Sequence, residues 1–124
     1  MITHSLAVPQ AWPLAELVRT VSLLGASADA QREHLQALGT WPSLDELGLE
    51  FDDIYPCLPA LRSTQVVSDQ AAAAVDRVFR LLRVSRGANV QFWDAASLPG
   101  SQWEAVREAA QAALRLLPSG TSSH

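Results

Sequence analysis

Lysine is absent from this chain of 124 residues, and all nine basic side chains are arginines. The formal net charge is −4 at pH 7. A surface that binds phosphates in general needs clustered positive charge, so nucleic acid is not an expected partner. The missing lysine and the frequent alanine together indicate the coding bias of a bacterial gene of high GC content, with no physical requirement behind it.

Cysteine is nearly absent too, since Cys57 is the only one. An internal disulfide is therefore impossible, and a reducing compartment is the simpler expectation. Residues 1–13 have no basic start and no long apolar run, so no signal peptide is predicted. No segment approaches the roughly 20 apolar residues of a membrane span. We expect a cytoplasmic protein without membrane contact.

The motifs of common catalytic sites are missing as well. The chain has no glycine-rich phosphate loop, no Gly-x-Ser-x-Gly elbow and no His-Glu-x-x-His pair. His34 has no second histidine four residues further on, so no metal site is predicted. Cys57 would need a base held by the fold, and the sequence identifies none. We therefore expect no catalytic residue, no cofactor and no enzymatic activity.

Apolar residues recur with helical spacing along most of the chain, which predicts an all-α fold, a compact bundle of about five helices. Residues 1–118 form a single domain in this prediction, and residues 119–124 form a disordered tail. The first helix is expected to begin at Pro13, a favoured first helical position, and to stop at Gly25.

Serine caps mark the starts of later helices. Ser27 is a predicted N-cap for the second helix, which Gly39 ends, and Ser68 caps a long helix that stops near Gly87. A capping box, Ser101 with Glu104, starts the last helix. The long helix carries apolar residues outside its main stripe, which predicts a central place in the bundle. These surplus residues are Leu81 and Val84.

The third helix is the segment "SLDELGLEFDDIYPCLPAL", residues 43–61. Ser43 and Glu46 form a capping box at its start. Its apolar spacing continues through Pro56, although proline supplies no amide and disfavours helix in the residue before it. We expect this helix to be kinked or split at Gly48 or Pro56.

This third helix carries five carboxylates and no base before Arg62. At about 100° per residue, the acids occupy an arc from about −20° to about 140° with Asp45 at zero, opposite the apolar residues. Such a separation is also that of an ordinary solvated helix face. Leu49 projects at about 40°, within the acids, as an interface anchor does inside a charged rim, unless it turns inward where the helix bends. The candidate partner-binding residues are Asp45, Glu46, Leu49, Glu50, Asp52 and Asp53, which we term the acidic face.

Arginines recur at every third position of the long helix, which makes them spiral around it instead of forming one stripe. Asp76 is placed to pair with Arg80 four residues later. The spiral can also pair with the acidic face, within one molecule or between two. The arginines are Arg77, Arg80, Arg83 and Arg86.

Four tryptophans are many for so short a chain. Tryptophan at helix ends usually closes a small core, with its indole N–H bonded to backbone or water. The pair Phe92–Trp93 lies in a segment without clear periodicity, and we expect it in the core. The other tryptophans are Trp12, Trp41 and Trp103.

The stretch Leu-Glu-Phe-Asp-Asp, the alanine-rich helix and a closing helix with Trp103, Val106-Arg107 and Ala109-Ala110 resemble a set of small uncharacterised bacterial α-helical proteins. The resemblance covers roughly residues 38–117. It implies no activity and carries over no catalytic residue. Pro56 departs from the pattern. In size and acidity the chain is similar to bacterial immunity proteins, which shield the active site of a toxin, by analogy of type.

Three functions follow as hypotheses. The first is a protein-binding module whose acidic face binds a basic protein, as an immunity or antitoxin protein binds a nuclease toxin. The second is a structural or assembly protein that self-associates through Leu81 and Val84. The third is an enzyme or small-ligand carrier with a pocket near Trp93 and Cys57, which a solid core would exclude.

Overall fold

Helices make up most of the described chain in the computed structural model, as the sequence predicts. The structure describes residues 3–88 and 90–118, and the side chains of residues 12–85 and 92–118; the predicted tail at 119–124 lies outside them. The α-helices in this part are α1 (Thr3–Leu24), α2 (Ala28–Leu38), α3 (Asp45–Ile54), α4 (Leu58–Ser63), α5 (Asp69–Ala88) and α6 (Ser101–Leu116). Single 3₁₀ turns are η1 (Tyr55–Cys57), η2 (Val90–Trp93) and η3 (Ala95–Ser97).

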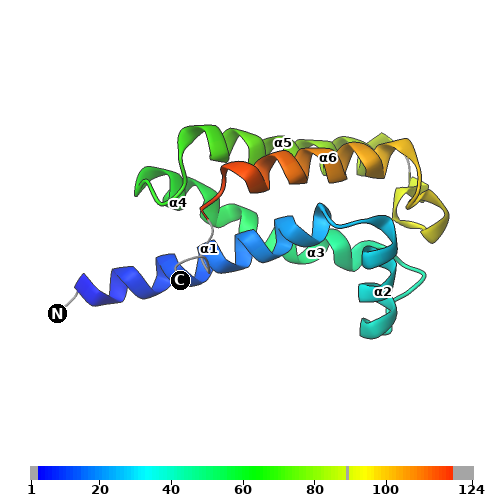
Figure 1. The fold of residues 1–124 in the computed structure, drawn as a ribbon, viewed down its shortest axis with the longest axis horizontal. Helices are drawn as coiled ribbons and strands as arrows, with labels where there is room; N and C mark the ends of the chain where they lie inside the picture. Colours follow the sequence, from blue (N-terminus) through cyan, green and yellow to red (C-terminus); the bar gives the residue numbers. More distant parts are fainter. Residues whose placement is uncertain (1–2, 89, 119–124) are drawn as a thin grey trace.

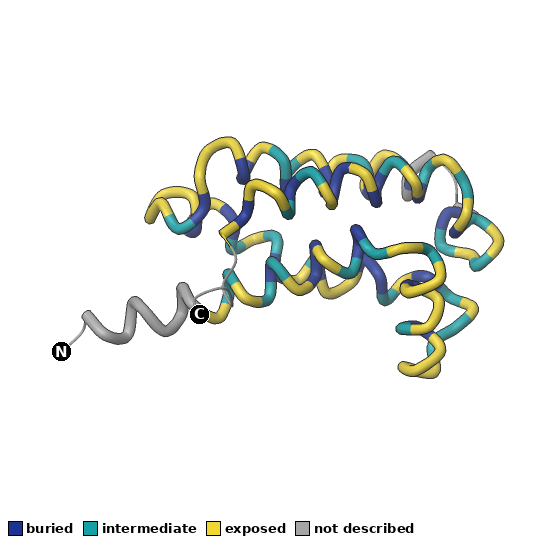
Figure 2. Tube along the Cα trace, in the orientation of Figure 1, coloured by how far each residue is buried: buried dark blue, intermediate teal, exposed yellow. Residues whose placement is uncertain are grey.

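The helices form two layers, with α5 and α6 side by side in one and α1 and α3 in the other (Figure 1). Contacts between α1 and α6 join the layers, and α2 lies at one end against α3. Buried residues follow the inward sides of both layers (Figure 2). The largest fully buried side chains are Trp103, Phe51 and Phe92. No strand is formed by the described residues, whose one β-bridge joins Ser43 to Asp94.

The predicted central position of the long helix is wrong. Helix α5 packs mainly along α6, and its other side faces solvent. Val84 is 67% exposed, and Leu81 is half-buried. Apolar residues outside the main stripe of a helix therefore mark an unpartnered surface here, which a sequence pattern cannot distinguish from a second packing face.

Helix α1 begins at Thr3, ten residues before the predicted start at Pro13. Proline fits the first turn of a helix because its φ is already helical, but the same φ fits any helical position. Inside a helix a proline removes its own amide hydrogen bond and crowds the carbonyl four residues earlier, but α1 runs on through Pro13. Its predicted end is confirmed, since the amide of Gly25 donates to Val21 O at 2.9 Å.

The predicted serine caps are confirmed at two helix starts. Ser27 Oγ accepts from the amide of Ala30 at 3.1 Å, and Ser68 Oγ accepts from the amide of Ala71 at 3.0 Å. Gly39 ends α2 in the left-handed conformation, with φ of 79°, which costs glycine little.

Neither predicted capping box forms. Ser43 Oγ accepts from the amide of Asp45 at 3.3 Å, and α3 begins one residue later than the box requires. Ser101 is the first residue of α6, after Gly100, so its side chain is inside the helix. In both places the chain enters the helix one residue away from the position that the motif assumes, a shift common at helix ends.

The break in the third helix falls at Pro56, as predicted. Helix α3 ends at Ile54, the turn η1 contains Pro56, and α4 follows from Leu58. Helix α3 is continuous through Gly48, so no split occurs there. A Cβ atom on Gly48 would lie 2.9 Å from Cη2 of Trp93. The absent side chain at residue 48 therefore leaves room for an indole.

Three aromatic rings fill the end of the core near η2. Phe92 stacks on Trp103 with ring centroids 4.3 Å apart, and Trp93 meets both rings edge-on. Nε1 of Trp103 donates to Phe92 O at 2.8 Å. The predicted core position is confirmed for Phe92, which is fully buried, and Trp93 is half-buried against it.

Candidate functional site

The acidic face is solvent-facing on a helix whose opposite side is buried. Leu47 and Phe51 are buried in the core, while Leu49 is 46% exposed on the outer side of α3. Because α3 continues past Gly48, Leu49 does not turn inward at a bend. One helix therefore presents an exposed leucine among its carboxylates. Asp45, Glu50 and Asp53 are exposed, and Glu46 and Asp52 are half-buried.

A base does reach this surface, although none is near in sequence. Nη2 of Arg19, on α1, lies 3.0 Å from Oε1 of Glu50 and 2.8 Å from Oε1 of Glu16. The hydrogen bond from Arg19 lowers the pKa of Glu16, and the two carboxylates raise the pKa of Arg19. Arg19 and Glu50 are exposed and Glu16 is only half-buried, so the pairs add little stability. Glu50 is therefore paired with a base that is distant in sequence.

Trp12 extends the acidic face onto α1. Its side chain is 61% exposed and lines a shallow cavity of about 180 Å³ with Glu16, Glu50, Asp53 and Ile54. Tryptophan at a helix end is expected to close the core, and for Trp12 this prediction is wrong. The useful signal was its spacing of four residues from Glu16, which places both on one helix face once α1 begins before Pro13.

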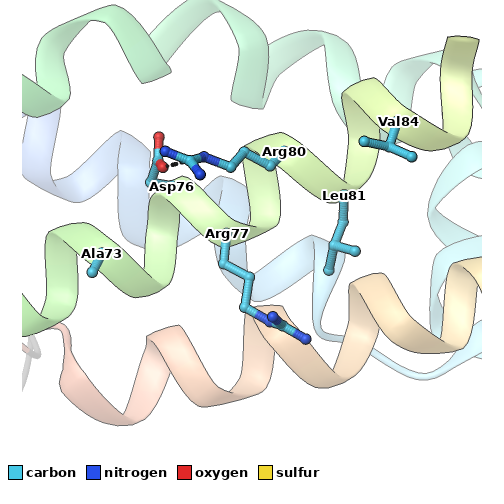
Figure 3. A pocket seen from close by; sticks show the side chains of 6 residues that line it. All are labelled: Ala73, Asp76, Arg77, Arg80, Leu81 and Val84. Atoms are coloured by element: carbon cyan, nitrogen blue, oxygen red, sulfur yellow. Dashed lines mark ion pairs between the residues drawn. The ribbon is translucent and has the colours of Figure 1, made fainter.

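A second surface feature is a groove of about 440 Å³ on α5, which we term the α5 groove (Figure 3). It lies on the unpartnered side of α5. The predicted pair is confirmed, with Arg80 Nε 2.7 Å from Asp76 Oδ2. In Figure 3 Arg80 reaches back to Asp76, while Arg77 and Leu81 point toward the side where α6 runs. The lining residues are Ala73, Asp76, Arg77, Arg80, Leu81 and Val84.

Asp76 also joins α5 to the break in the third helix. It accepts a short hydrogen bond from the hydroxyl of Tyr55, whose ring stacks on Phe79 with centroids 3.8 Å apart. Burial, reinforced by the Asp76 carboxylate, raises the pKa of Tyr55 to about 12. The guanidinium of Arg83 lies 5.6 Å from the centre of the Phe79 ring. Tyr55 and Asp76 therefore satisfy each other, a structural role for both.

The described residues bring no three histidine, cysteine or carboxylate side chains together in a way that could hold a metal ion. Cys57 is half-buried in η1. The indole of Trp93 packs against Gly48, Phe92 and Trp103 and fills the space between them.

None of the helices in the described ranges has the length and apolar character needed to cross a membrane.

Comparison with known proteins finds no match to this chain among family models, curated sequences or solved structures. The resemblance to small bacterial α-helical proteins therefore stays a prediction.

Proposed function

We propose that this protein is a small acidic protein-binding module whose contact surface is the acidic face. The observation that carries the proposal is the exposure of Leu49 among the carboxylates of α3. An apolar side chain inside a charged rim is the arrangement found at protein interfaces, where a partner buries the apolar centre and the polar rim surrounds it.

The charge of the surface defines the partner. Five carboxylates lie on α3, with Arg19 paired to Glu50, and such an acidic surface attracts a basic protein and speeds its association at low salt. Trp12 adds an aromatic ring beside Glu50 and Asp53, where a cationic side chain of the partner can lie over the ring.

The concrete version of the proposal is an immunity or antitoxin-like protein that blocks a basic toxin such as a nuclease. Acidic side chains on α3 would occupy positions where the toxin binds phosphate groups of its substrate. The net charge of −4 and the small helical fold support this version.

A tagged pull-down from host lysate, first at low and then at moderate salt, tests the proposal. We expect a basic protein that is retained stoichiometrically and released by salt. Replacing Asp52 and Asp53 by Asn removes two charges of the acidic face and should weaken retention. The matched control is Glu108→Gln, an exposed acid on α6. Equal affinity of the Asn variant and the control contradicts the proposal.

The second candidate function is a self-associating structural or assembly protein without catalytic activity. The exposure of Val84 in the α5 groove supports it, because no other helix of the described ranges covers this apolar strip. Sedimentation of the chain over a range of concentrations tests this candidate, and a monomer throughout contradicts it.

A further inference from the structure

Two exposed apolar surfaces in the described part of the chain, the acidic face and the α5 groove, differ in charge. The acidic face surrounds Leu49 with carboxylates. The α5 groove flanks Leu81 and Val84 with Arg77 and Arg80. Within the described chain Arg77 forms no ion pair, and Arg80 is paired with Asp76 at the edge of the groove. The α5 groove therefore offers the guanidinium of Arg77 to the carboxylates of the acidic face.

Neither surface covers the other within one molecule, because both Leu49 and Val84 remain exposed. Pairing two α5 grooves would bring arginines against arginines, and pairing two acidic faces would bring carboxylates together. Like charges placed opposite each other disfavour an interface. Charge complementarity thus favours contact between unlike surfaces of two molecules.

We propose that the acidic face of one molecule docks into the α5 groove of a second copy of this chain. Leu49 inserts beside Leu81 and Val84, and the carboxylates around Leu49 meet Arg77 and Arg80. The contact is a helix laid in a groove, with one apolar anchor and a charged rim. The inference rests on the proposed function, since it uses the same acidic face and names a second copy as an occupant.

Such a contact joins two different surfaces, so in a pair one molecule keeps an unused α5 groove and the other keeps an unused acidic face. It therefore extends head to tail or closes into a ring. Six residues line the α5 groove, whereas a stable interface uses roughly 20–30 residues on each side. The association is thus weak, dependent on concentration and reduced by salt. A basic partner that binds the acidic face competes with it.

Sedimentation equilibrium of the full chain tests the inference, together with two variants that each destroy one surface. Leu49→Asp removes the apolar anchor of the acidic face and leaves the α5 groove intact. Val84→Asp places a carboxylate in the α5 groove and leaves the acidic face intact. Both residues are exposed, so both variants fold, which circular dichroism checks. The control is Leu38→Asp, the same change at a residue of α2 that is 52% exposed.

We expect the wild type and the Leu38→Asp control to rise above the monomer mass of 13.4 kDa with concentration at low salt. Each groove or anchor variant alone should stay monomeric, with association weakened about tenfold or more. An equimolar mixture of Leu49→Asp and Val84→Asp should form a one-to-one dimer and nothing larger, because it retains one intact pair of surfaces.

Three results overturn the inference: a wild type that is monomeric at every concentration, self-association of Leu49→Asp equal to wild type, or no dimer in the mixture. The proposed function is judged separately. A basic host protein retained by Val84→Asp and lost from Leu49→Asp supports the binding module even when the wild type is monomeric. Self-association with no captured basic protein supports assembly and contradicts the toxin-blocking role.

Discussion

Nη1 of Arg107 donates a hydrogen bond to Oε1 of Gln31 at 3.1 Å, although the two residues are 76 positions apart. Gln31 is fully buried and Arg107 is 5% exposed. The side-chain nitrogen Nε2 of Gln31 in turn donates to the carbonyls of Leu23 and Leu24, both at 3.0 Å. Because α1 ends there, neither carbonyl accepts from an amide four residues later, and Leu23 O accepts in addition from the amide of Ala26 at 3.2 Å. A side chain of α6 thus fixes the turn between α1 and α2.

Arg107→Leu should destabilise the fold by about 2–4 kcal/mol, because Gln31 loses its donor and charged hydrogen bonds are among the strongest. Arg107 also donates to Leu98 O and pairs with Glu104. Chemical denaturation, monitored by tryptophan fluorescence, measures the change in unfolding free energy. Arg115→Leu, at an exposed position of the same helix, is the control and should change stability little.

A Gly48→Ala substitution should destabilise the protein, against the usual effect in a helix. Alanine favours a helix over glycine by about 1 kcal/mol. The new Cβ would meet the Trp93 ring at 2.9 Å, and overpacking costs about 1–3 kcal/mol. We expect a net loss of about 1 kcal/mol in unfolding free energy. In a Trp93→Phe background the loss should shrink. A Gly48→Ala protein as stable as wild type contradicts this packing.

Stability should fall as the pH rises from about 10 to about 12, the range between the ordinary pKa of Tyr55 and its value in the fold. The raised pKa means that the folded state favours the neutral hydroxyl. Its contribution is complete below pH 10 and is lost as the pH rises through 12. Tyr55 is the only tyrosine, so ultraviolet absorbance reports its titration directly. Tyr55→Phe should flatten the decline in stability, and an equal slope in both proteins contradicts the prediction.

Arg19→Gln should strengthen binding of a basic partner, because it removes the positive charge beside Glu50. We expect the association rate at low salt to rise roughly two- to threefold, with a steeper dependence on salt. Stopped-flow or surface binding kinetics measures the rate. Arg32→Gln, on α2, is the control. A slower association than wild type would show that Arg19 contacts the partner favourably.

Much of the fold follows from local signals in the sequence. The caps at Ser27 and Ser68 and the break at Pro56 depend on a few neighbouring residues, so the sequence predicts them. The start of α1 was missed because proline at the first helical position and proline inside a longer helix have the same φ.

The remaining features depend on contacts between distant residues. Arg19 neutralises Glu50 from another helix, and Gly48 accommodates Trp93 from η2. Helical spacing predicts which face a residue occupies, but not which helix covers that face. For this reason the sequence places the carboxylates on one face of α3 and marks Leu81 and Val84 as surplus, while the exposure of Trp12 and the shape of the α5 groove follow from the packing of the helices.

The most direct test of the binding surface compares three tagged proteins in one pull-down at low salt: wild type, Leu49→Asp and the control Leu38→Asp. We predict that wild type and Leu38→Asp retain the same basic protein in stoichiometric amount and that Leu49→Asp loses it. Equal retention by all three proteins, or no basic protein with the wild type, would contradict the proposal that the acidic face is a protein-binding surface.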